Sequence, residues 1–210
     1  MGRGNNNIAI KIILMAPIIL NLLHTIERAD RLQSFMEQMN QQTIPFKVWH
    51  GFTDNLPFKA ISRSHKQIVE YAKNSNLPSI TIAENDILFT SPKSWATYLK
   101  QMPEDFDLYL GSISGGNVDE KTKTADQWSG LILYTVHQRF YDAFLAADEM
   151  KNIDRWLSGL GLEEIEKLLG RKPVYKVCYP LPAICIDGLS GNSGKMVEHE
   201  NCFAAYRLLK

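Results

Sequence analysis

PSITIAENDILFT, residues 78–90, contains two apolar runs separated by a short acidic cluster. The first run, Ser79 to Ala83, is rich in β-branched residues, which is typical of a buried strand. The cluster Glu84 to Asp86 follows directly, and strand formation gives no reason for two carboxylates in three positions. The stretch therefore predicts a strand that ends either in a solvated acidic turn or in a site that uses the acids.

Strand and helix patterns alternate on both sides of this strand. Up to residue 110 the predicted elements are a strand over 8–15, a helix from His24 or Thr25 to Pro45, a strand over 46–49, a helix with Ser62 or Ser64 as its N-cap, the strand over 79–83, a helix from Ser91 and a strand over 106–110. Strands linked by helices form βαβ units. We therefore expect an α/β fold with a mostly parallel central sheet, and ligands at the carboxyl ends of its strands.

The second half of the chain is more irregular. A polar, glycine-bearing segment over 111–123 predicts a mobile loop of the kind that closes over substrates. The remaining predictions are a strand over 128–134, helices over 138–147, 152–157 and 162–169, and a strand over 174–178. We expect a single domain over 1–210, with residues 1–7 disordered and a Pro- and Gly-rich tail over 179–210 that folds back over it.

Composition describes an ordinary globular protein. The chain has 210 residues, 45% hydrophobic and 22% charged, with 23 basic and 23 acidic side chains. Zero formal net charge gives no basic surface for nucleic acid, so nucleic acid is not an expected partner. The three cysteines form no C-x-x-C pair, which argues against a zinc site or a disulfide framework and favours a reducing cytoplasm.

The apolar segment IAIKIILMAPIILNLL, residues 8–23, resembles a signal peptide or membrane anchor. Lys11 and Pro17 interrupt it, it is shorter than the roughly 20 residues that span a bilayer, and no small-residue cleavage site follows. A buried strand is the preferred interpretation. We expect a cytoplasmic protein, and peripheral contact with the inner face of the membrane stays open.

The acidic cluster has a chemical use besides a turn. Carboxylates are ligands for Mg²⁺ or Mn²⁺, which usually bind one or two of them together with substrate phosphates. Transfer from a nucleotide sugar needs such an ion, because negative charge develops on the departing diphosphate.

The longer stretch SRSHKQIVEYAKNSNLPSITIAENDILFTSP, residues 62–92, resembles glycosyltransferase family 25. In that family a Ser-His pair, here Ser64-His65, opens a helix, and an acidic triplet, here Glu84 to Asp86, follows the next strand. The opening, middle and closing parts of the family resemble ILNLLHTIERADRLQSFMEQM (19–39), WSGLILYTVHQRFYDAFLAA (128–147), NIDRWLS (152–158) and YPLPAICIDGLSGNSGK (179–195). The resemblance covers roughly residues 20 to 195 in order.

This resemblance implies a single glycosyltransferase A type domain and a hexosyltransferase-like, inverting reaction mechanism. The implied donor is a nucleoside diphosphate sugar, with uridine diphosphate sugars as a first guess, and the implied acceptor is lipopolysaccharide, capsule or another surface glycan. A divalent cation, Mn²⁺ or Mg²⁺, is implied as cofactor. The chain departs from the family at Asn85, where the middle acid is usual, and at Cys185, where Gln is usual. Asn85 weakens the expected metal site, although its carbonyl can still bind a cation or a ribose.

The resemblance and the residue chemistry together nominate a set of site residues, each with an ordinary structural alternative. Asp86, Asp187 and His199 are candidate metal ligands, or solvated turn and tail residues. Glu84 and Asp154 are candidate catalytic residues, Asp154 as the base that takes the acceptor proton or as a helix cap. The candidate donor-binding residues are Arg28, Arg31, Ser64, His65, Asn85 and Trp128; their alternatives are a polar helix face for the arginines, a core or capping role for His65 and a core role for Trp128.

Three functions are consistent with these residues. The first is a metal-assisted glycosyltransferase, and the second is a catalytically weak or inactive sugar- or nucleotide-binding domain of the same fold, suggested by Asn85. The third is a Mg²⁺-dependent phosphate-transfer or hydrolase domain that uses the same acids.

Overall fold

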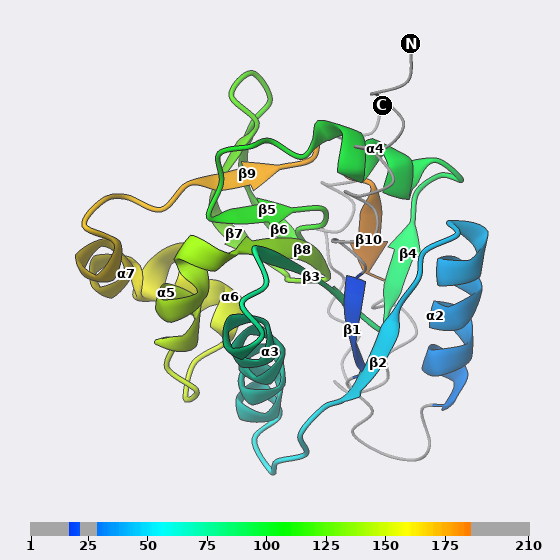
Figure 1. Ribbon diagram of the computed structural model, residues 1–210, viewed down its shortest axis with the longest axis horizontal. Helices are drawn as coiled ribbons and strands as arrows, with labels where there is room; N and C mark the ends of the chain where they lie inside the picture. Colours follow the sequence, from blue (N-terminus) through cyan, green and yellow to red (C-terminus); the bar gives the residue numbers. More distant parts are fainter. Residues whose placement is uncertain (1–16, 22–28, 186–210) are drawn as a thin grey trace.

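A computed structural model describes residues 17–21 and 29–185 of the chain (Figure 1). The predicted strand over 8–15, the N-terminal residues 1–7 and the tail beyond residue 185 lie outside these residues. So do three nominated site residues, Arg28, Asp187 and His199.

Short strands and helices alternate along the described chain. They are β1 (Pro17–Asn21), α2 (Ala29–Gln41), β2 (Lys47–His50), α3 (Pro57–Asn74), β3 (Ser79–Glu84), β4 (Ile87–Phe89), α4 (Ser94–Gln101), β5 (Leu108–Leu110), β6 (Gly115–Asp119), β7 (Thr124–Ser129), β8 (Leu133–His137), a 3-10 turn η2 (Gln138–Phe140), α5 (Tyr141–Leu145), α6 (Ile153–Arg155), a π-helical turn η3 (Trp156–Leu160), α7 (Leu162–Leu169), β9 (Tyr175–Val177) and β10 (Ala183–Cys185).

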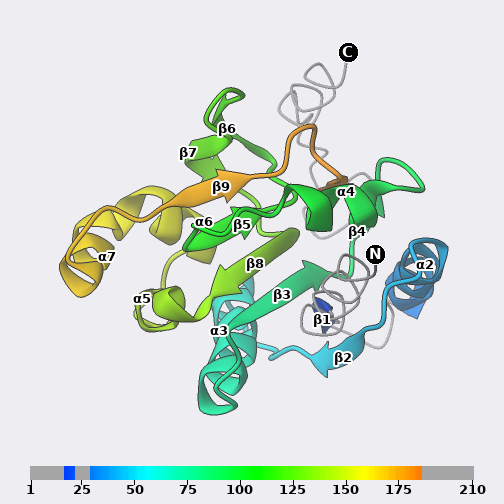
Figure 2. The ribbon, with the colours of Figure 1, turned by 45° about the horizontal axis from the view of Figure 1, so that its top comes forward.

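The strands form one large sheet in the order β2-β1-β3-β8-β5-β9-β7-β6 (Figure 2). β10 pairs with β4 in a separate two-stranded sheet (Figure 1). The expected α/β fold is confirmed, but the sheet is parallel only in part. β2, β1 and β3 run parallel, as do β5 and β9, whereas β8 lies antiparallel between β3 and β5. The helical crossover from β3 to β5 therefore skips one position, which a strand-helix alternation in the sequence cannot reveal.

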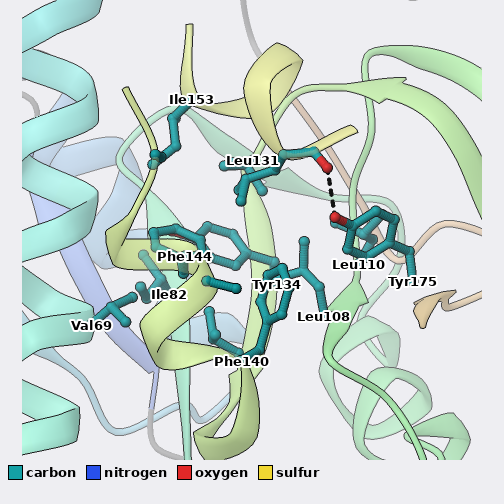
Figure 3. Packing of buried hydrophobic residues seen from close by; sticks show 14 of the residues in the cluster. Val69, Ile82, Leu108, Leu110, Leu131, Tyr134, Phe140, Phe144, Ile153 and Tyr175 are labelled. Carbon is teal, nitrogen blue, oxygen red and sulfur yellow. Dashed lines mark hydrogen bonds between the residues drawn. The ribbon is translucent and has the colours of Figure 1, made fainter. Parts of the chain in front are cut away.

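Helices cover both faces of the sheet. One apolar cluster joins α3, α5, η3 and α7 to the first face, and a second joins α2, α4 and β4 to the other (Figure 1). Figure 3 shows the first cluster around Tyr134, whose ring stacks on Phe144 with centroids 6.1 Å apart. Each such side chain contributes about 1.5–3 kcal/mol when it is fully buried. The central strands β3, β5 and β8 are buried on both faces, so their sequences show little alternation of polar and apolar residues.

The start of α3 differs from the prediction. α3 begins at Pro57, a residue that suits the first helical turn because it needs no hydrogen-bond partner for a backbone N–H. Ser62 and Ser64 therefore lie inside the helix, fully buried, and neither is an N-cap. Ile68 and Val69, one turn further along α3, are also fully buried, so this side of the helix faces the core.

Two predictions in the second half are wrong in part. The segment over 111–123 is not one loop, because β6 and β7 form an antiparallel hairpin. The predicted strand over 128–134 is divided between β7 and β8 by a bend at Gly130, whose φ is +90°. A Cβ at Gly130 would lie 2.6 Å from Oγ of Ser114, so the bend needs glycine for both its conformation and its space.

A buried carboxylate joins three strands at the amino edge of the sheet. Asp107, just before β5, has no exposed surface. It accepts hydrogen bonds from Nε of Arg139 at 2.8 Å, from both terminal nitrogens of Arg171 at 2.6 Å and from the Val174 backbone at 2.7 Å. Burial raises the pKa of Asp107, but these hydrogen bonds outweigh it and hold the pKa below its usual value. Asp107 therefore fastens the starts of β5 and β9 together.

The helices of the described residues are too short or too polar to cross a bilayer.

Candidate functional site

The acidic cluster lies at the carboxyl edge of the sheet. β3 ends at Glu84, and Asn85 and Asp86 form the turn that leads into β4. The parallel register of β1 with β3 places Leu20 opposite Glu84, so β1 ends beside the turn. The antiparallel β8 begins at Leu133 on the same edge. The turn therefore lies where α/β sheets commonly bind ligands.

Glu84 is held by a buried histidine. Nε2 of His65 lies 3.0 Å from Oε1 of Glu84, and Nδ1 of His65 lies 2.5 Å from the hydroxyl of Tyr134. His65 and Tyr134 have no exposed surface, while the side chain of Glu84 is 15% exposed. A chain of hydrogen bonds thus runs from the core to a carboxylate at the sheet edge.

Burial sets the protonation of this chain. Loss of hydration lowers the pKa of His65 to about 3, so the imidazole is neutral at physiological pH. Burial, and secondarily the charge of Glu84, raises the pKa of Tyr134 well above its usual value, so the phenol keeps its proton. The contact between His65 and Glu84 is therefore a hydrogen bond donated by a neutral ring to the carboxylate rather than an ion pair.

Ser64 has a structural role. Its hydroxyl donates to the Ala60 carbonyl at 2.7 Å and accepts the Phe52 backbone N–H at 2.8 Å. Since the side chain is fully buried, it fastens the loop between β2 and α3 and offers no surface to a donor. The Ser-His pair thus separates into a loop clamp and a partner of Glu84.

The other two residues of the acidic turn differ in burial. Asn85 is 2% exposed, and Asp86 is half-buried. Carboxylate and amide oxygens are both suitable ligands for Mg²⁺ and Mn²⁺. Within residues 17–21 and 29–185, no three or more His, Cys, Asp or Glu side chains are grouped to hold a metal ion.

Asp154 is connected to Glu84 through one loop. Oδ2 of Asp154 accepts the Gly130 backbone N–H at 2.8 Å, and Oδ1 accepts that of Arg155 at 2.7 Å. Two residues after Gly130, the carbonyl of Ile132 accepts the Glu84 backbone N–H at 2.8 Å. Asp154 therefore clamps a loop that also contacts the end of β3. It does not cap α6, whose N-cap residue is Asn152.

Trp128 and Arg31 lie elsewhere. Trp128 is fully buried, and its ring meets Tyr175 edge-on, with centroids 5.6 Å apart and an angle of 87° between the planes. A ring in this position has no exposed face on which a sugar could stack. Arg31 is half-buried in the first turn of α2.

Tyr134 is the second hydrogen-bond partner of His65, a contact that residue patterns did not predict. It is 69 residues from His65 along the chain, and only the pairing of β3 with β8 brings the two together. Its sequence signal, an aromatic residue in a strand, is shared by core residues.

The described fold is similar to known solved structures. A glycosyltransferase involved in the glycosylation of the major capsid of PBCV-1 matches 93% of this chain and 100% of its own, with a TM-score of 0.51 and 8% sequence identity. The fold is of the glycosyltransferase A type.

Two further solved structures match less closely. HddC from Yersinia pseudotuberculosis matches 78% of this chain and 89% of its own, with a TM-score of 0.49 and 11% identity. The Drosophila beta-1,4-galactosyltransferase 7, in complex with manganese, UDP-Gal and xylobiose, matches 79% of this chain and 64% of its own, with a TM-score of 0.45 and 11% identity. No protein-family model and no curated sequence matches the chain, so the resemblance to family 25 stays a prediction.

Proposed function

We propose that the chain transfers a sugar from a nucleoside diphosphate sugar to a hydroxyl group of a glycan. The observation that carries the proposal is the acidic turn at the carboxyl edge of β3, in a fold of the glycosyltransferase A type. Glu84 is hydrogen-bonded to the buried His65, and a simple solvated turn would not need such a partner. Lipopolysaccharide, capsule or another surface glycan is the proposed acceptor, an inverting reaction the proposed stereochemistry, and the cytoplasm the proposed location.

Asp86 and Glu84 are the carboxylates proposed to hold a divalent cation, with the carbonyl oxygen of Asn85 as a third oxygen. These oxygens suit an ion that completes its coordination with donor phosphates, as Mg²⁺ and Mn²⁺ commonly do. When bound, the ion would neutralise charge on the departing diphosphate. Asp187 and His199 remain proposed as further ligands, and Arg28 and Arg31 remain proposed for the diphosphate.

Asp154 is proposed as the base that takes the proton of the acceptor hydroxyl. Each of its oxygens accepts one backbone N–H, and a carboxylate oxygen can accept a second hydrogen bond. A carboxylate in α6 that bonds the loop contacting the end of β3 would lie close to the donor site. The alternative is that Asp154 only clamps this loop.

Donor hydrolysis with Mn²⁺ tests the proposal, using a panel of nucleoside diphosphate sugars with uridine diphosphate sugars first. We expect Asp86→Ala to lower turnover by about 100-fold or more, since an electrostatic contact to the leaving group is lost. Glu163→Ala, at an exposed position in the first turn of α7, is the matched control and should leave turnover unchanged. Release of phosphate from simple phosphate esters instead would favour the hydrolase alternative.

The second candidate, a binding domain with weak or no catalysis, is favoured by Asn85. Because Asn85 is 2% exposed, a carboxylate at this position would be costly to bury until a cation neutralises it. We therefore expect Mn²⁺ to raise the melting temperature of Asn85→Asp by more than that of the natural protein. Nucleotide sugar binding without turnover in the natural protein, with turnover gained in Asn85→Asp, would establish the binding-domain alternative.

A further inference from the structure

We propose that His65 is a positioning residue that fixes the orientation of the Glu84 carboxylate, with its proton on Nε2 toward Glu84 and with Nδ1 accepting a hydrogen bond from the Tyr134 hydroxyl. The kinetic consequence of this inference rests on the proposed function. The hydrogen-bond chain itself does not, and it can be tested without any substrate.

The sheet register places the three residues together. In the antiparallel pairing of β3 with β8, Ile82 lies opposite Tyr134. Glu84 is two residues after Ile82 and therefore points to the same face of the sheet. α3 packs on this face, since its Ile68 belongs to the same apolar cluster as Ile82 and Tyr134. His65, one turn before Ile68 on α3, thus faces Glu84 at the end of β3 and Tyr134 near the start of β8.

Packing holds the hydrogen-bonded residues Tyr134, His65 and Glu84 in this position. The Tyr134 ring is held between its stacking contact with Phe144 and a tilted contact with the His65 ring, whose centroid is 5.7 Å away. Neither His65 nor Tyr134 is exposed to solvent. Water therefore cannot replace either hydrogen bond without opening the core.

The order of donors follows from chemistry. A neutral imidazole carries one N–H donor and one acceptor nitrogen. The Glu84 carboxylate can only accept, so it requires the proton of His65 on Nε2. Nδ1 is then the acceptor of the hydrogen bond that the Tyr134 hydroxyl donates. The three residues form one directed chain, Tyr134 to His65 to Glu84.

This order has a consequence for the site. A glutamate at the end of a strand would ordinarily sample several rotamers, and a fixed donor selects one of them. The carboxylate is then oriented before a donor or a cation arrives. Pre-orientation of a functional side chain by a buried partner typically changes activity about 10- to 100-fold.

Nitrogen-15 spectra of histidine-labelled protein test the hydrogen-bond chain directly. We expect long-range ¹H–¹⁵N correlations to show the His65 ring as the neutral tautomer with its proton on Nε2. We also expect the Nδ1 resonance to shift in Tyr134→Phe, which keeps the ring and removes the hydroxyl. A proton on Nδ1, or a Tyr134→Phe spectrum identical to that of the natural protein, would overturn the proposal.

Donor hydrolysis tests the consequence for the site. His65→Leu removes both ring nitrogens, whereas His65→Gln keeps an N–H donor near the position of Nε2. We expect kcat to fall about 10- to 100-fold in His65→Leu, with KM for the donor changed by less than about twofold, and to recover largely in His65→Gln. Equal kcat values in His65→Leu and His65→Gln would contradict a positioning role. A loss of kcat/KM that comes from a higher KM would contradict it as well. Absence of turnover in the natural protein would refute the proposed function. The nitrogen-15 spectra would still show whether the hydrogen bonds between Tyr134, His65 and Glu84 are formed as proposed.

Discussion

Replacing Asp107 by asparagine removes the charge that joins the amino edge of the sheet. Asp107 accepts four hydrogen bonds, three of them from the guanidinium groups of Arg139 and Arg171. Breaking a buried ion pair by removing one partner costs about 3–5 kcal/mol. The two arginines are 36% and 40% exposed and can regain water, so we expect the lower end of this range. Asp107→Asn should therefore lower the free energy of unfolding by about 3 kcal/mol at pH 7.

The effect should depend on pH with a defined sign. The pKa of Asp107 is below its usual value in the folded protein, so its stabilising contribution is complete above the unfolded-state pKa of about 3.9. It is lost as pH falls through the lower folded-state pKa. The difference in the free energy of unfolding between the natural protein and Asp107→Asn should be constant from about pH 7 to pH 5 and should shrink below about pH 4.

Urea unfolding followed by tryptophan fluorescence, at neutral pH and in acid, measures this difference. Asp105→Asn is the matched control, because Asp105 also bonds Arg139 but its side chain is 76% exposed. An exposed pair contributes at most about 1 kcal/mol. A loss below about 1 kcal/mol for Asp107→Asn, or a difference that does not shrink in acid, would refute the reasoning.

Two further predictions concern the loop between β7 and β8. Gly130→Ala should lower the free energy of unfolding by about 2 kcal/mol or more, because φ is +90° and the added Cβ would collide with Ser114. Gly159→Ala is the control: no atom lies within 4 Å of its added Cβ, so urea unfolding should show a change of less than about 1 kcal/mol. Asp154→Asn can still accept the Gly130 N–H, so we expect its unfolding free energy to fall by less than about 1 kcal/mol while sugar transfer falls about 100-fold; unchanged transfer would leave Asp154 only as a loop clamp.

The sequence predicts the α/β class and the main helix faces because apolar spacing is a local property. Phe35 and Met39 are buried on α2 as the helical spacing requires, and α7 ends at Gly170 with a φ of +67°. The orientation of β8 is not local. It depends on which neighbours its edges meet, and buried strands carry little pattern to identify them.

Local sequence patterns also did not predict several short elements. β6 and β10 lie in segments whose glycine, proline and polar residues are typical of loops, and they are strands because of their pairing partners. Glu104 and Asp105 lie shortly before Asp107, and nothing in the local sequence shows that Asp107 alone of the three acids is buried. Only the folded chain brings Arg139 and Arg171 to it from 32 and 64 residues away.

The candidate site was predictable where its residues are contiguous. Glu84, Asn85 and Asp86 stand out because they interrupt an apolar strand. The contact of Glu84 with His65 was not predictable from spacing, since the two belong to different elements 19 residues apart. Ser64 and Trp128 have polar or aromatic side chains suited to ligands, but the fold uses both in the interior.

The central claim is that the acidic turn at the end of β3 binds a nucleotide donor together with a metal ion. Isothermal titration calorimetry with uridine diphosphate and other nucleoside diphosphates, with and without Mn²⁺, tests it most directly. We predict tighter binding with Mn²⁺ in the natural protein and loss of this Mn²⁺ dependence in Asp86→Ala. Absence of nucleotide binding at millimolar ligand, or a Mn²⁺ dependence that Asp86→Ala retains, would contradict the claim.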